Sequence, residues 1–155
     1  MSARLDPQRL KAANINPATG LATDYLNHYN EIAMMIGFLE ETPEFREAVL
    51  DWRPMGYAAH FRLTGFRERD LAIAAYEAAP DGVKQRFLTA RRQLDLAIAD
   101  VQDLIEAAPD TAASLARHAP SIFAAIASLG AVINSGQEAA PADNDAQAAA
   151  DSLFS

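Results

Sequence analysis

The chain has 155 residues, half of them apolar, and a formal net charge of −8 from 13 basic and 21 acidic side chains. That charge argues against non-specific binding of nucleic acid or of an anionic membrane, because both need a basic surface. The absence of cysteine excludes disulfides, iron–sulfur clusters and thiolate metal sites. Residues 1–14 contain no apolar secretory segment, so we expect a cytoplasmic protein with one main domain.

Helix-forming residues fill the segments between the Pro and Gly breaks, and strict apolar–polar alternation over several cycles is absent from the sequence. We therefore predict an all-α protein, a compact bundle of about six helices over residues 1–135. Residues 136–155 are rich in Ala, Asp and Gln, which is the composition of a flexible acidic linker, and they end in a short C-terminal peptide.

The strongest signal in the first half is an amphipathic helix predicted over residues 21–41. Its apolar residues repeat at steps of four and three. That period places them on one face, which we expect to be buried. They are Tyr25, Tyr29, Ile32, Ile36 and Leu39.

Shorter helices flank this one. One is predicted directly behind Asp6-Pro7, since proline suits the first turn of a helix. Another is predicted to start with Thr42 as its cap and to stop before Pro54. One or two more are expected over residues 55–79.

Two long helices in the second half are predicted to form an antiparallel hairpin, because only a short turn joins them. The first covers about residues 83–107, with Asp81 as its cap. The second follows the break at Pro109-Asp110 and extends to about residue 134, with Pro120 dividing it. The buried stripe predicted for the first helix consists of Val83, Phe87, Ala90, Leu94, Ile98, Val101 and Ile105.

The second hairpin helix belongs to an uncharged run over residues 119–137. The polar, Pro and Gly residues in this run argue against a membrane-spanning segment, which needs about 20 predominantly apolar residues. We expect it to be the most buried helix of the bundle. Its small residues Ala124, Ser128 and Ala131 are expected to let a neighbouring helix approach closely.

The charges of the first hairpin helix are reversed relative to the helix dipole. The basic half comes first and the acidic half second, in the order Lys84, Arg86, Arg91, Arg92, then Asp95, Asp100, Asp103, Glu106. One interpretation is a homodimer, in which an antiparallel copy of the helix sets each basic half against an acidic half. The other is pairing with neighbouring helices of the same chain.

Asp24, Asn27, His28 and Glu31 are the candidate catalytic or ligand-binding residues. At about 100° per residue, Asp24, His28 and Glu31 would lie together at the edge of the buried face, where a cleft could form. An acid and an amide three residues apart, as Asp24 and Asn27 are, can also orient a water molecule for attack on a phosphoryl group.

The same four residues have a structural alternative. Asp24 would favour the dipole of the helix start, and His28 would bond to Asp24 or Glu31. A carboxylate-bridged di-iron site in a bundle needs about six ligands, and His60 is one of few further candidates, so neither a metal nor a cofactor is expected.

The chain ends in Asp151-Ser152-Leu153-Phe154, an apolar pair behind an acidic linker. One interpretation is a peptide that folds as a helical turn on a protein partner, with Leu153 and Phe154 as anchors and Asp151 at the start of the turn. The other is a segment that docks on its own bundle.

This ending resembles the C-terminal peptide by which CheZ-type chemotaxis phosphatases hold the response regulator CheY, and it is similar to the regulator-binding peptide of FliM. The order of hairpin, linker and terminal peptide is similar to that family as well. The resemblance implies a receiver-domain response regulator as the partner. The family works with an Asp-x-x-x-Gln pair in the middle of a hairpin helix, whereas Asp81 and Gln85 lie at the start of the helix here.

The sequence therefore favours a cytoplasmic regulatory or interaction protein that binds a protein partner through Asp151, Leu153 and Phe154. The alternative is a helical-bundle enzyme or a ligand- or metal-binding protein that uses the Asp24, His28 and Glu31 cluster.

Overall fold

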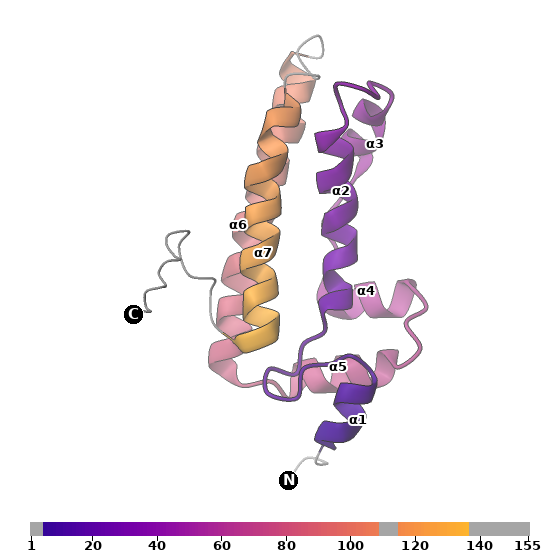
Figure 1. Cartoon of the computed structure of the whole chain (residues 1–155), viewed down its shortest axis with the longest axis vertical. Helices are drawn as coiled ribbons and strands as arrows, with labels where there is room; N and C mark the ends of the chain where they lie inside the picture. The colour runs from indigo at the N-terminus through magenta and orange to yellow at the C-terminus, as the bar shows by residue number, and fades with distance from the viewer. Residues whose placement is uncertain (1–4, 109–114, 137–155) are drawn as a thin grey trace.

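The computed structural model describes residues 5–108 and 115–136. Within these ranges the chain is all-α, as predicted, with seven α-helices, 3-10 turns over residues 23–26 and 115–118, and no strand (Figure 1). In chain order the elements are α1 (Pro7–Ala12), the 3-10 helix η1 (Thr23–Leu26), α2 (Asn27–Gly37), α3 (Phe45–Asp51), α4 (Tyr57–Leu63), α5 (Arg69–Glu77), α6 (Asp81–Ala107) and α7 (Ala119–Ser135).

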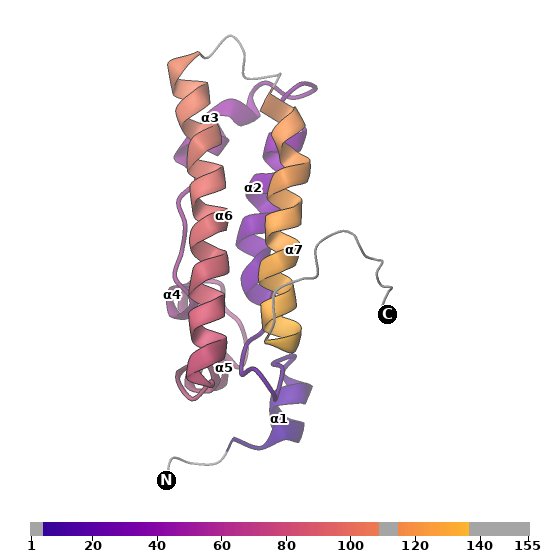
Figure 2. The ribbon, with the colours of Figure 1, turned by 90° about the vertical axis from the view of Figure 1, so that its left-hand side faces the viewer.

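Three helices form the body of the bundle. α2, α6 and α7 run side by side along the long axis, and α6 and α7 are the predicted antiparallel hairpin (Figures 1 and 2). α3 lies at one end of this body, and α1, α4 and α5 gather at the other. The two ends of the bundle are therefore closed by short helices.

Both predicted apolar faces are buried. The five apolar residues predicted for the first face are at most 1% exposed: Tyr25, Tyr29, Ile32, Ile36 and Leu39. All seven residues of the stripe predicted for α6, which begins at Val83 and ends at Ile105, are buried. The two faces meet in one core. Each large apolar side chain buried there contributes about 1.5–3 kcal/mol to the free energy of unfolding before entropic costs.

The helix predicted over residues 21–41 is shorter than expected, because its first residues are extended. Ala22 has φ of −121° and ψ of 138°, and the carbonyl of Leu21 accepts from the amide of Asn16 at 2.8 Å instead of from a residue one helical turn later. The amide of Leu21 donates to the Thr19 hydroxyl at 3.2 Å, and the amide of Ala22 donates to the Tyr57 hydroxyl at 2.9 Å. Regular α-helix therefore starts only behind η1 and ends at Gly37.

Gly20 is required in the turn before this segment. Its φ is +75°, and a Cβ at this position would lie 2.6 Å from the carbonyl oxygen of Ala75. Because glycine has no side chain, this turn can pack directly on the backbone of α5, just before η1 begins.

Two other predicted helix starts are wrong. α3 begins at Phe45 behind Glu44, because Thr42 forms a separate turn in which its carbonyl accepts from the Phe45 amide at 3.0 Å. α6 begins at Asp81 behind Pro80, whose carbonyl already accepts from the amide of Lys84. The break predicted at Pro109-Asp110 lies outside the described residues.

The structure refines the prediction for α7 in two ways. The predicted division falls just before Pro120, which lies in the first turn of α7, because a 3-10 turn over residues 115–118 precedes the α-helix. Close contact with a neighbouring helix occurs at Gly130, where a Cβ would lie 3.3 Å from a methyl group of Leu26, whereas Ala124 is exposed. A glycine on the buried face of α7 therefore sets its approach to η1 and α2.

By length and composition alone, the helical segment Leu115–Ser135 could cross a membrane. In the bundle, however, α7 buries Ile122, Ile126 and Leu129 in the core that it shares with α2 and α6.

Replacing Ile32 by Asp is expected to lower the free energy of unfolding by about 3–5 kcal/mol, because it puts an unpaired carboxylate at a fully buried position of α2. Met34→Asp is the matched control, since Met34 lies on the same helix but is 52% exposed, and its effect should stay within about 0.5 kcal/mol. Urea unfolding measures both. Equal midpoints for the two variants would show that this face of α2 does not belong to the core.

Candidate functional site

The predicted cluster of Asp24, His28 and Glu31 does not form one site. Asp24 belongs to η1, and a 3-10 helix turns by about 120° per residue, so the angular relation expected for one α-helix is lost. Asp24 bonds to His60, His28 bonds to the carbonyl of Arg53, and Glu31 is exposed.

Asp24 is held by two side chains. Its Oδ2 lies 2.9 Å from Nε2 of His60, and its Oδ1 accepts from the side-chain Nδ2 of Asn27 at 3.2 Å. His60 is only 2% exposed, whereas the Asp24 side chain is 33% exposed. The buried imidazole of α4 therefore supports a carboxylate whose other side faces solvent.

The second ring nitrogen of His60, Nδ1, is buried and has no hydrogen-bond partner among the described residues. An unbonded ring nitrogen is best tolerated as the unprotonated nitrogen of a neutral imidazole. In that tautomer Nε2–H donates to Oδ2 of Asp24. The pair could not be found from spacing, because 36 residues separate its members.

Asp24 and Asn27 line a pocket of about 510 Å³ between α1, the 14–17 turn and the end of α7. Its polar lining includes Lys11, Asn14 and Asn134, and Asn14 adopts a left-handed backbone with φ of 63°. A carboxylate, an ammonium group and several amides around one hollow can bind a small polar molecule, with Asp24 taking a cationic or donor group.

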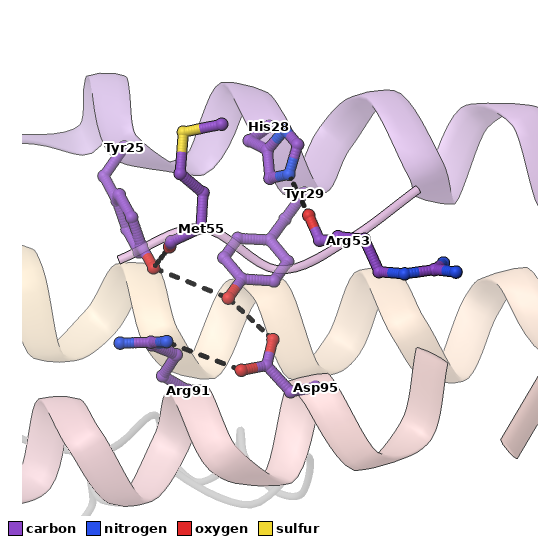
Figure 3. Close-up of polar contacts among 7 residues, drawn as sticks. All are labelled: Tyr25, His28, Tyr29, Arg53, Met55, Arg91 and Asp95. Atoms are coloured by element: carbon purple, nitrogen blue, oxygen red, sulfur yellow. Dashed lines mark hydrogen bonds and ion pairs between the residues drawn. The ribbon is translucent and has the colours of Figure 1, made fainter. Parts of the chain in front are cut away.

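His28 serves the packing of α2 on the segment behind α3. Its ring stacks on Trp52 with the centroids 4.6 Å apart, and its Nε2 lies 2.6 Å from the carbonyl oxygen of Arg53 (Figure 3). The indole of Trp52 donates in return to the carbonyl of His28 at 3.2 Å. The predicted bond from His28 to Asp24 or Glu31 is therefore wrong, because the ring bonds to a segment 25 residues further along the chain.

Two tyrosines of the core face make hydrogen bonds to distant segments: Tyr29 connects α2 to α6, and Tyr25 connects η1 to the segment between α3 and α4 (Figure 3). The Tyr29 hydroxyl donates to Oδ1 of Asp95 at 2.7 Å, and the Tyr25 hydroxyl donates to the carbonyl of Met55 at 2.6 Å. The two hydroxyl oxygens lie 3.5 Å apart, and Asp95 also pairs with Nε of Arg91 at 3.4 Å. The sequence showed these tyrosines only as core residues, because their partners lie on distant segments.

Burial raises the pKa of the Tyr25, Tyr29 and Tyr57 hydroxyls above the ordinary value of about 10. For Tyr29 the neighbouring Tyr25 and the carboxylate of Asp95 raise the pKa further, since both disfavour a phenolate. All three hydroxyls therefore stay protonated in the fold where a free tyrosine ionises.

Comparisons with protein-family models, with curated proteins and with solved structures find no match to this chain. Over residues 5–108 and 115–136, no three His, Asp or Glu side chains come together in a way that could hold a metal ion. The predicted partner-binding residues Asp151, Leu153 and Phe154 lie outside the described residues.

The raised tyrosine pKa values predict a loss of stability at high pH. Above about pH 10 the unfolded chain releases phenolic protons that the folded chain keeps, so the free energy of unfolding should fall as the pH rises further. The free energy of unfolding of Tyr29→Phe should fall less steeply over the same range. At neutral pH this variant should be less stable than the parent by about 1 kcal/mol, because it lacks the hydrogen bond to Asp95. Urea unfolding at a series of pH values measures both slopes, and identical slopes would contradict the assignment.

Proposed function

We propose that this is a cytoplasmic regulatory protein that binds a protein partner through its C-terminal peptide, with Asp151, Leu153 and Phe154 as the contacting residues. The observation that carries the proposal is the end of α7. Gly136 closes the helix in a left-handed conformation, with φ of 75° and its amide bonded to the carbonyl of Val132 at 2.7 Å. The carbonyl of Gly136 accepts in turn from Nε of Arg86 at the start of α6.

The bundle is thus capped where the acidic linker begins. Its described core draws on residues from Leu10 to Ile133, which already bury the apolar faces of α2, α6 and α7. The residues that follow offer almost no apolar side chain larger than Ala until Leu153 and Phe154. Such a composition favours a tether that carries a terminal anchor to another molecule.

A receiver domain of the CheY type is the most specific partner, as the resemblance of residues 151–154 implies. Two apolar anchors supply about 3–6 kcal/mol before the cost of ordering the peptide, which by itself corresponds to binding from roughly the millimolar range to tens of micromolar. Affinity of this order suits a reversible regulatory contact.

Replacing Leu153 and Phe154 together by Ala should abolish capture of a CheY-like receiver by the full-length chain and leave its melting temperature unchanged, because the anchors act outside the bundle. Gln147→Ala is the matched control in the same tail and should capture as the parent does. Pull-down and thermal unfolding of the same samples give both readouts. A clear fall in melting temperature for the double variant would instead make the tail a structural clasp.

The pocket beside Asp24 supports a second candidate function, the binding of a small polar molecule with a cationic group. The supporting observation is the carboxylate held between His60 and Asn27 at the wall of a 510 Å³ hollow. A group positioned by a buried partner is pre-organised for a ligand. His28 and Glu31 take no part in this version of the site.

Asp24→Asn tests the second candidate, because Asn keeps the size of the side chain and can still accept from His60. Native mass spectrometry of the purified full-length chain should show a small-molecule adduct that Asp24→Asn lacks. Glu31→Gln, which removes an exposed carboxylate outside the pocket, should keep the adduct. An adduct of equal abundance in all three proteins would place the ligand elsewhere.

A further inference from the structure

α6 carries a row of exposed side chains on the side away from the core. They lie four residues apart, and we call this row the outer ridge: Leu88, Arg92, Leu96, Asp100 and Leu104. Its leucines are 40%, 60% and 45% exposed in chain order. At about 100° per residue, the central Leu96 lies about 180° around the helix from the buried Phe87. The ridge therefore presents three large apolar side chains to solvent along one helix.

The outer ridge is complementary to itself. Arg92 lies four residues before Leu96 and Asp100 four residues after it, while Leu88 and Leu104 lie eight residues before and after. A second copy related by a two-fold axis through Leu96 therefore sets Arg92 of each chain against Asp100 of the other. The same rotation brings Leu96 of one chain against Leu96 of the other, and Leu88 and Leu104, each about 80° around the helix from Leu96 in opposite senses, flank that contact.

We propose that the outer ridge is the contact surface of an antiparallel homodimer, with Leu96 on the two-fold axis. Rows of residues four apart are the ridges that interlock in the commonest class of helix packing. Each copy also sets an acidic half of α6 against a basic half, which offsets the unfavourable order of charges along the helix dipole.

Pairing within the chain accounts for the other basic residues of α6 but not for the ridge. Lys84 donates to the carbonyl of Glu77 at the end of α5, Arg86 donates to the carbonyl of Gly136, and Arg91 pairs with Asp95. Arg92 and Asp100 form no ion pair with any of the described residues. Both charges of the ridge are thus left for a second copy, and the two-fold axis brings them together.

The surface beside the ridge has room for the side chains of a second copy. Leu88 and Leu96 border a hollow of about 430 Å³ against Trp52 and Pro54, and Leu104 borders one of about 550 Å³ against α7. Because each hollow lies next to a leucine of the ridge, an opposing leucine can enter it and leave water.

The experiment is sedimentation velocity of the full-length chain at low ionic strength, over a range of protein concentrations. The parent should form a dimer that weakens with added salt. Arg92→Asp and Asp100→Arg, each alone, should weaken it at least about tenfold, because each places like charges at both symmetry-related contacts. A mixture of the two variants should dimerise again, since each chain then faces opposite charges.

Leu96→Glu tests the axis itself, because it brings two carboxylates together there, and it should give a monomer. Leu63→Glu is the matched control: Leu63 is 73% exposed on α4, away from the ridge, and its variant should sediment as the parent does. Circular dichroism checks that all variants fold. The double alanine variant of the tail should also stay dimeric, which separates this proposal from the proposed function.

Three results would overturn the proposal. They are a parent that stays monomeric at high concentration and low salt, a dimer that survives Leu96→Glu, and a mixture of the charge variants that fails to restore the dimer.

Discussion

The hydrogen bond from Tyr29 to Asp95 sets the register between α2 and α6, on which the arrangement of the other elements depends. It lies in the core, where a displaced partner would leave a polar group unpaired at a cost of about 1–3 kcal/mol. With α2 placed in this way, Tyr25 reaches the carbonyl of Met55 and His28 stacks on Trp52. The segment between α3 and α4 is therefore laid along α2.

That segment in turn positions the candidate pocket. α4 starts directly behind it, and His60 on α4 is brought against Asp24 in η1, directly before α2. The hydroxyl of Tyr57, also on α4, accepts from the amide of the extended residue Ala22. Both contacts of α4 therefore fall on the segment in front of α2, where the chain departs from the expected helix and where the candidate site lies.

The two proposed interactions occupy different parts of the molecule and are compatible with each other. The outer ridge lies on the side of α6 away from the core, whereas the chain leaves the described bundle at Gly136 beside Arg86. In an antiparallel dimer centred on Leu96, Arg86 faces the region of Glu106 in the second copy. The two starting points of the tails are then separated by on the order of 30 Å, the rise of about 20 helical residues. Each tail could engage its own partner molecule.

The sequence by itself determined the helical class of the protein and the faces that form the core. The periods of Tyr25 to Leu39 and of Val83 to Ile105 are local signals, and burial of apolar surface acts on them whatever the neighbour is. Only the tertiary structure decided where α2 begins, that Gly130 sets the approach of α7, and that Asp24 pairs with His60 and not with His28. Each of these depends on a hydrogen bond or close contact between segments distant in the chain, and helical spacing carries no information about such partners.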